Sequence, residues 1–199
     1  MISAILLAAG ESSRMGRTKQ ILKFRESTIL QETVRNLLGS KIDELIVVLG
    51  HDADKLRRLL SLESRARLVL NQEYRKGIGS SIRCGVQSAD PNTEAFLIAL
   101  ADQPLIRTEI IDLLIERYRV THAGIVAPVY RSIKGHPVII SRKYRNELLK
   151  LSGDRGARDL LERHRDDTVN VEVDSPEILQ DVDREEDYLR LRRQPGPPY

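Results

Sequence analysis

The chain has 199 residues, with 32 Lys and Arg against 29 Asp and Glu, and a single cysteine, Cys84. This length suits one domain with a sizeable core, and 41% hydrophobic with 31% charged residues excludes a disordered chain. Basic and acidic residues are interspersed, which excludes the clustered basic face of a nucleic-acid-binding protein and favours a small anionic ligand. One cysteine cannot form an internal disulfide, so we expect a reducing compartment.

The first ten residues are apolar but lack the basic start of a signal peptide. No run reaches the roughly 18 apolar residues of a transmembrane helix. We therefore expect a cytoplasmic protein without a membrane partner. We expect one domain over residues 1–191 and a flexible, proline-rich tail at 192–199.

Short apolar runs alternate with segments of helical periodicity along the chain. The runs are rich in Val, Ile and Leu, which is typical of strands covered on both faces. They span Ile2–Ala8, Glu44–Leu49, Arg67–Leu70, Ala95–Ala101, Gly124–Val129, Pro137–Ser141 and Thr168–Val173. Apolar stripes of helical spacing lie at Ile29, Val34, Leu37 and Leu38, at Leu56, Leu59 and Leu60, and at Ile110, Leu113 and Leu114. The alternation predicts a three-layer α/β fold with a mostly parallel sheet, which binds ligands outside the carboxyl ends of its strands.

A loop with anion-binding features follows the first strand, in the stretch LLAAGESSRMGRTKQ at residues 6–20. Its glycines permit tight turns, successive backbone N–H groups can cradle phosphate oxygens, and Arg14 and Lys19 add positive charge. The loop is not a P-loop, because Met15 stands where the second glycine would be, and the dinucleotide fingerprint also fails at Ser12. A solvated loop with its cations in water is the alternative at this stage.

Asp102 follows the apolar run Ala95–Ala101, and Pro104 prevents the strand from continuing. An acid at the end of a central strand points into the crevice, where Mg²⁺ prefers a few carboxylates together with phosphate oxygens and water. The alternative is that Asp102 caps a helix that begins near Ile106.

Asp181 and Asp183 follow the last apolar stretch, and alternate residues of an extended chain face the same side. Both carboxylates could therefore reach one cation. The alternative is that Asp183 caps the last helix and that Glu186 completes a capping box.

Several motifs together resemble the molybdenum cofactor nucleotidyltransferase family, a family of MobA-like NTP transferase domains, and its cytidylyltransferase branch most. The loop LAAGESSRMGRTK is similar to that family's signature. Further segments come in family order: GIGSSIRCGV (77–86), ALADQP (99–104), GHPVII (135–140), GDRGAR (153–158) and DVDREEDY (181–188). The family's late motif resembles D-x-D-T-P-E-D, and Arg184 and Glu185 depart from its Thr-Pro pair.

This resemblance implies the Rossmann-like fold of nucleotide-diphospho-sugar transferases. It implies transfer of CMP from CTP to a phosphorylated acceptor, the molybdenum-pterin cofactor, with release of pyrophosphate. Mg²⁺ is the implied metal, with Mn²⁺ as an alternative, and a molybdenum enzyme is implied as receiver of the product. The guanine-using branch carries LAGG where this chain has Ala9 within LAAG, which favours cytidine.

The resemblance also implies roles for individual residues. The catalytic residues are Arg14, Lys19 and Asp102. Nucleotide contacts are expected at Leu7, Ala8, Ala9, Gly10, Ser12, Ser13, Arg14, Lys19, Asn71, Gly79, Ser80, Ser81 and Asp102. The metal ligands are Asp102 and Asp183, and the acceptor contacts are Gly135, His136 and Arg158.

Alternatives stay open for several of these residues. Asn71 could read a pyrimidine edge with its paired donor and acceptor, whereas either Ser80 or Ser81 could simply cap a helix. His136 could be hydrogen-bonded locally in a turn. In the segment 153–158, capping of a helix by Asp154 is the alternative to contact with the acceptor phosphate.

Three other functions compete with cofactor cytidylylation. One is a nucleotidyltransferase for a sugar or alcohol phosphate, which would share the loop and metal site. Another is a non-catalytic carrier of the finished cofactor, although a carrier does not need Asp102 and Asp183. The third is an NAD(P)-dependent redox protein, against which the missing glycine fingerprint counts.

Overall fold

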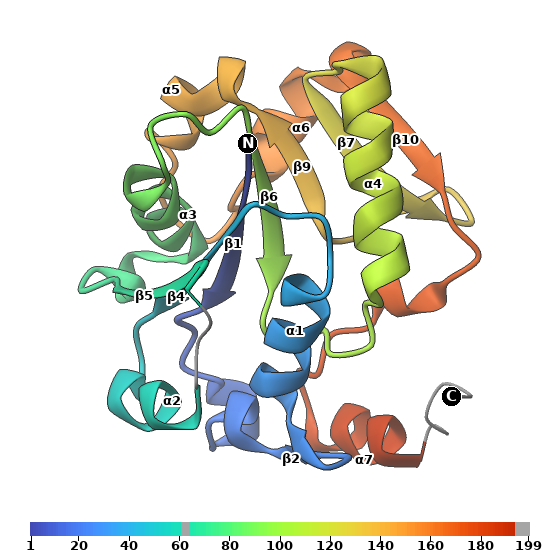
Figure 1. The fold of residues 1–199 in the computed structure, drawn as a ribbon. Coiled ribbons are helices and arrows are strands. Elements are labelled where there is room, and N and C mark those ends of the chain that lie inside the picture. The colour runs from blue at the N-terminus through green and yellow to red at the C-terminus, as the bar shows by residue number, and fades with distance from the viewer. Residues whose placement is uncertain (61–63, 194–199) are drawn as a thin grey trace.

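The computed structural model describes residues 1–60 and 64–193, with Arg14 described by its backbone. At its centre lies an eight-stranded sheet in the order β10-β7-β9-β6-β1-β4-β5, with β8 paired to β7 (Figure 1). Its strands are β1 (Ile2–Ala8), β4 (Glu44–Leu49), β5 (Ala66–Leu70), β6 (Ala95–Leu100), β7 (Ile125–Tyr130), β8 (Ile133–Lys134), β9 (Val138–Ser141) and β10 (Thr168–Glu172).

Strand direction brings the loops that carry the candidate residues to one edge of this sheet. β1 is parallel to both β4 and β6, with Ala8 opposite Leu49 and Leu7 opposite Leu100. β10 is parallel to β7, whereas β9 runs antiparallel between β6 and β7. The loop after β1 and Asp102 after β6 therefore leave the sheet side by side, as expected for a mostly parallel sheet.

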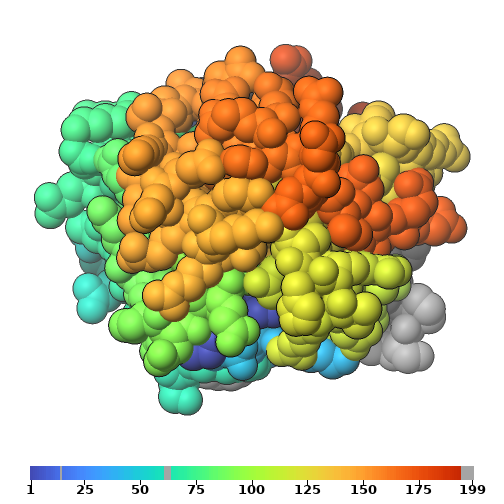
Figure 2. All heavy atoms as spheres, turned by 90° about the horizontal axis from the view of Figure 1, so that it is seen from above, coloured from blue at the N-terminus to red at the C-terminus, as the bar shows by residue number. Residues whose placement is uncertain are grey.

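Helices cover both faces of the sheet because the side chains of each strand alternate between them. One apolar cluster joins Ala4 and Leu6 of β1 to α1 (Ile29–Leu38), α2 (Ala53–Leu59) and α4 (Thr108–Thr121). The other joins Ile5 and Leu7 to α3 (Ile78–Ser88), α5 (Arg145–Leu148) and α6 (Arg158–Arg163). Seen from above, α4 in yellow lies below the segment of α5 and α6 in orange (Figure 2). The three-layer α/β architecture is thereby confirmed.

A smaller unit lies beyond the carboxyl edge of the sheet (Figure 1). It contains the two-stranded sheet of β2 (Lys23–Phe24) and β3 (Ser27–Thr28), together with α7 (Glu185–Arg193). A third apolar cluster holds them together, made of Leu22, Phe24, Ile29, Val182, Tyr188 and Leu191. This packing brings the end of the chain back to the loop after β1.

Short 3-10 turns complete the described chain and include η1 (Ser13–Met15), η2 (Lys19–Ile21), η3 (Tyr74–Lys76), η4 (Arg142–Tyr144), η5 (Arg165–Asp167) and η6 (Pro176–Leu179). The strand predictions agree with the structure to within one residue at each end. The two-residue strands β2, β3 and β8 were not predicted, because such short pairs carry no periodicity. α7 continues to Arg193, and the rest of the expected tail, 194–199, lies outside the described residues. Within residues 1–60 and 64–193, no helix has both the length and the apolarity needed to cross a membrane.

Candidate active site

The loop after β1 is held in one shape by its own polar side chains. Ser12, with a φ of 52°, accepts a hydrogen bond from the Lys19 backbone N–H at 3.3 Å and donates one to the Gln20 carboxamide oxygen at 3.3 Å. Thr18 donates a hydrogen bond to the carboxylate of Asp52, at the start of α2. These contacts place the Lys19 side chain over the end of the sheet.

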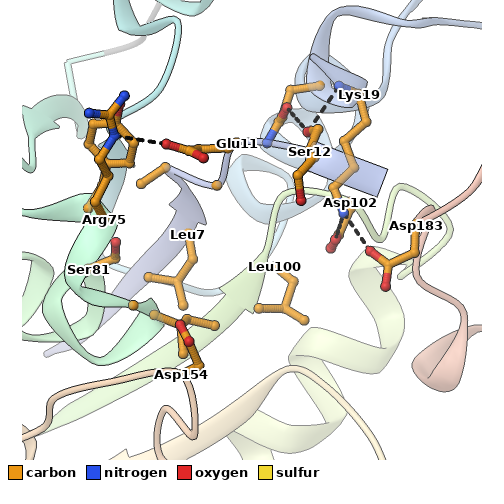
Figure 3. Close-up of a pocket in the computed structure, with 17 residues that line it drawn as sticks. Leu7, Glu11, Ser12, Lys19, Arg75, Ser81, Leu100, Asp102, Asp154 and Asp183 are labelled. Carbon is orange, nitrogen blue, oxygen red and sulfur yellow. Dashed lines mark hydrogen bonds and ion pairs between the residues drawn. The ribbon is translucent and has the colours of Figure 1, made fainter. Parts of the chain in front are cut away.

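Lys19 lies between two carboxylates at this edge. Its Nζ is 2.5 Å from Asp102 Oδ2 and 2.8 Å from Asp183 Oδ1 (Figure 3). Only 12% of the Lys19 side chain is exposed, against 16% for Asp102 and 38% for Asp183. Burial alone would lower the pKa of Lys19, but the charges of Asp102 and Asp183 and their hydrogen bonds outweigh it and raise that pKa. The ammonium group therefore stays charged.

The same carboxylates fit a divalent cation. Asp102 Oδ1 is buried and has no hydrogen-bond partner within the described part of the chain, which leaves an oxygen ligand to spare. No group of three or more His, Cys, Asp or Glu among the described residues could hold a metal ion. Two carboxylates suffice for Mg²⁺ when substrate phosphates and water supply the remaining ligands.

The Asp102 alternative as a helix cap is wrong. α4 begins at Thr108, six residues beyond Asp102, and Arg107 occupies its N-cap position. Asp102 instead points into the crevice with Lys19.

A cavity of about 840 Å³ extends from Lys19 and Asp102 across the carboxyl ends of β1 and β6 (Figure 3). Most residues expected to contact nucleotide line it, namely Leu7, Ala9, Gly10, Ser12, Ser13, Lys19, Ser81 and Asp102. Arg14, expected beside them, has its side chain outside the described part of the chain. The cavity thus collects residues from five separate segments of the sequence, within 7–20, 74–81 and 100–102 and at Asp154 and Asp183.

Two expected nucleotide contacts turn inward instead. The Asn71 amide donates to Ser80 Oγ at 2.9 Å and to Ser81 Oγ at 3.0 Å, and its oxygen accepts the Glu73 N–H at 2.9 Å. Asn71 and Ser80 are 5% and 2% exposed, and neither lines the cavity. Their role is to hold the turn between β5 and α3, and Ser81 alone of these three lines the cavity.

Gly79 and Ala8 lie outside the cavity lining for packing reasons. A Cβ at Gly79 would lie 2.7 Å from the backbone nitrogen of Ser152, so this glycine permits close packing of α3 against that loop. The side chain of Ala8 is fully buried in the core beneath α1. Neither lines the cavity, and Ala8 can offer a ligand only its backbone.

The opposite end of the cavity from Lys19 holds an ion pair that sequence reasoning missed (Figure 3). Arg75 Nε lies 3.0 Å from Glu11 Oε1, and the Arg75 guanidinium lies 5.6 Å from the centre of the Tyr74 ring. Glu11 and Arg75 are far apart in the sequence, so no local pattern could reveal the pair. The lone acid of the cationic loop was the available signal. Other lining residues that the sequence did not assign to the nucleotide are Ile78, Leu100 and Asp154.

A second cavity of about 790 Å³ adjoins the first and contains the expected acceptor residues Gly135, His136 and Arg158. The two cavities share Leu7, Ile78, Leu100 and Asp154 in their walls. The second cavity has an aliphatic floor, and its wall carries four cationic residues, Lys134, Arg155, Arg158 and Arg165, beside three acidic ones, Asp154, Glu162 and Asp181. It could hold a phosphorylated molecule with a larger body.

His136 lies within this second cavity, and its Nδ1 is buried without a hydrogen-bond partner among the described residues. Burial lowers the pKa of His136, and a hydrogen bond to the Ile98 backbone offsets only part of this effect. The ring is therefore neutral at pH 7. A Cβ at Gly135 would lie 2.4 Å from the Ile178 carbonyl oxygen, so only glycine fits there. α6 begins after Ala157 without a side-chain cap, which removes the capping role of Asp154.

Asp181 and Asp183 line different cavities. Asp183 faces the first cavity with Lys19, whereas Asp181 faces the second and accepts a hydrogen bond from Gln103 Nε2 at 2.6 Å. Asp181 is exposed as a residue, but desolvation of its carboxyl group and the charge of Asp102 raise its pKa to about 6. Asp183 is therefore the better partner for Asp102 at a cation.

Several known proteins are similar to this chain over nearly its whole length. Molybdenum cofactor cytidylyltransferase of Escherichia coli is 26% identical, with 96% of this chain and 95% of that protein covered. Nicotine blue oxidoreductase of Paenarthrobacter nicotinovorans is 29% identical, with 96% of each chain covered. The structure of Rv0371c from Mycobacterium tuberculosis matches with a TM-score of 0.86 and 29% identity, covering 97% of this chain and 98% of that one. That protein has also been solved as a complex with manganese. The MobA-like NTP transferase domain matches residues 4–169, and the chain belongs to this nucleotidyltransferase family.

Proposed function

We propose that the protein is a cytoplasmic cytidylyltransferase that moves CMP from CTP onto the phosphate of an acceptor and releases pyrophosphate. The proposed acceptor is the molybdenum-pterin cofactor, and the finished product passes to a molybdenum enzyme. The observation that carries the proposal is the meeting of Lys19, Asp102 and Asp183 beside two adjoining cavities. The likeness to the Escherichia coli cytidylyltransferase supports the nucleotide and the acceptor.

The proposed reaction is an in-line displacement. An oxygen of the acceptor phosphate attacks the α-phosphorus of CTP, the bond to the bridging oxygen breaks, and pyrophosphate leaves with that oxygen. The enzyme needs no covalent nucleophile, because positioning and charge neutralisation supply the rate enhancement. Lys19, the backbone N–H groups of its loop and Arg14 would hold the triphosphate. A divalent cation, Mg²⁺ or Mn²⁺, held by Asp102 and Asp183 would neutralise charge on the phosphates.

The second cavity supports a phosphorylated acceptor. Arg158 and Lys134 lie at its wall as cations, and a guanidinium matches phosphate with two parallel N–H groups. His136 is neutral and buried, so it would orient the acceptor by hydrogen bonding rather than by charge. Because both cavities share Leu7 and Leu100, an acceptor phosphate there can approach the α-phosphorus.

The test is pyrophosphate release with CTP, GTP, ATP and UTP, each with Mg²⁺ and with or without the molybdenum-pterin cofactor. We expect release with CTP that depends on the acceptor. A sugar or alcohol phosphate that replaces the cofactor would contradict the proposed acceptor. Release that is equal for CTP and GTP would contradict the proposed base.

A redox function is the second candidate, because a relative of 29% identity over nearly the whole chain is named an oxidoreductase. The discriminating measurement is the absorbance of NADH or NADPH mixed with the protein and a dye substrate such as nicotine blue. Oxidation of the nicotinamide without any pyrophosphate release would replace the transferase proposal.

A further inference from the structure

Asp183 lies in an irregular segment at the start of α7, and its position relative to Asp102 depends on what anchors that segment. One anchor is the Val182 N–H, which donates to the Asp102 carbonyl oxygen at 3.1 Å. The Val182 side chain is buried in the third apolar cluster. These contacts hold Val182 close to Asp102. They do not fix the orientation of the peptide group of Asp183, which other groups must determine.

The carboxylate of Asp187 supplies that constraint. Asp187 Oδ2 accepts the Arg184 N–H at 2.9 Å and the Asp183 N–H at 3.3 Å. The first N–H groups of a helix have no partner within the helix, and Asp187, the third residue of α7, satisfies two of the N–H groups at its start. The expected capping box of Asp183 with Glu186 is therefore wrong, because the acceptor is one residue further along.

A second set of contacts joins α7 to the loop that carries Lys19. Arg17 Nη2 lies 2.7 and 2.6 Å from the two carboxylate oxygens of Glu185. The Arg17 guanidinium also lies 5.8 Å from the centre of the Tyr188 ring, and the Tyr188 hydroxyl donates to the Lys23 carbonyl oxygen at 2.9 Å. Helix α7 therefore ties the Asp183 segment and the Lys19 loop together.

We propose that Asp187 is a positioning residue that holds the Asp183 carboxylate toward Asp102 and Lys19, with the Arg17–Glu185 pair fixing α7 against the loop. This inference rests on the proposed metal role of Asp183. Groups that orient a metal ligand without touching the metal alter metal affinity by about 10- to 100-fold when removed. Loss of the Asp187 carboxylate frees the Asp183 peptide to rotate, and its carboxylate then leaves the cation.

The test uses the whole protein and titrates it with Mn²⁺, following the loss of the electron paramagnetic resonance signal of the free ion. We expect Asp187→Ala to raise the Mn²⁺ dissociation constant about tenfold, and Asp187→Asn to stay within about twofold of wild type, since its amide oxygen still accepts hydrogen bonds. Glu186→Ala, an exposed neighbour on the same helix, is the matched control and should bind Mn²⁺ normally. Circular dichroism verifies that each variant is folded.

Charge reversal provides an independent route that leaves Asp187 in place. Arg17→Glu should weaken Mn²⁺ binding, and the double variant Arg17→Glu with Glu185→Arg should recover most of it. Normal Mn²⁺ affinity in folded Asp187→Ala, or equal losses in the alanine and asparagine variants, would overturn the positioning role. If Asp183→Asn itself leaves Mn²⁺ affinity unchanged, the metal role of Asp183 fails instead, and that part of the proposed function fails with it.

Discussion

Replacing Lys19 by methionine removes one positive charge while keeping a long, unbranched side chain. The lost contacts are the ion pairs of 2.5 Å to Asp102 and 2.8 Å to Asp183. A hydrogen bond to a charged group is worth about 1.5–3 kcal/mol. Two effects reduce the loss: the variant no longer has to desolvate an ammonium group, and water screens the partly exposed Asp183. We therefore expect the free energy of unfolding to fall by about 2 kcal/mol. Loss of one preorganised charge should lower kcat by about 10²- to 10³-fold.

Urea denaturation measures the first quantity, and pyrophosphate release with saturating CTP and acceptor measures the second. Lys23→Met is the matched control, because Lys23 is exposed and its contact with Tyr188 uses only the backbone carbonyl. Because the pKa of Lys19 is raised in the folded protein, its stabilising effect is fully present below the unfolded pKa of about 10.4 and is lost as the pH rises through the folded value. A kcat within about threefold of wild type for Lys19→Met, where a preorganised charge predicts a far larger loss, would refute the role of this ammonium group.

Three further substitutions test other parts of the account. Asp102→Asn should lower kcat by about 10²- to 10³-fold and weaken Mn²⁺ binding; a change confined to the KM for CTP would contradict the metal role. Ala9 is buried at the cavity wall. Ala9→Gly should therefore reduce the preference for CTP over GTP by about tenfold, which is the effect of losing one methyl contact. The measurement is the ratio of the kcat/KM values for the two nucleotides. Asp167 accepts the Gly124 N–H at 3.1 Å and pairs with Lys143 at 2.6 Å. Burial alone would raise the pKa of Asp167, but these contacts outweigh it and lower that pKa. Asp167→Asn should therefore cost about 1 kcal/mol of unfolding free energy at pH 7. This difference should disappear as the pH falls below 3.8 through the folded pKa, and an equal difference at pH 3 would show that the charge is irrelevant.

The sequence predicts the sheet well because buried parallel strands are continuous apolar runs, which need no knowledge of their partners. β1 and β4 agree residue for residue with the runs Ile2–Ala8 and Glu44–Leu49. The loop after β1 and Asp102 were also predictable, since parallel strands bring their carboxyl ends together. These features depend on local pattern and on a general property of α/β sheets.

Other parts of the site depend on contacts that no local pattern encodes. Asn71 has the right chemistry to read a base, but its hydrogen bonds go to Ser80 and Ser81 in a buried network. The Glu11–Arg75 pair joins residues 64 positions apart. The capping acid of α7 depends on the residue at which the helix begins, and a shift of one position exchanges Glu186 for Asp187.

The most direct test of the central claim follows two labelled forms of CTP through one turnover with Mg²⁺ and the molybdenum-pterin cofactor. We predict that a label on the α-phosphate appears in the acceptor product, whereas a label on the γ-phosphate appears in pyrophosphate in equal amount. Both signals should be lost in Asp102→Asn. An acceptor that stays unlabelled while CTP is bound, or a label from the γ-phosphate in the acceptor, would contradict nucleotidyl transfer.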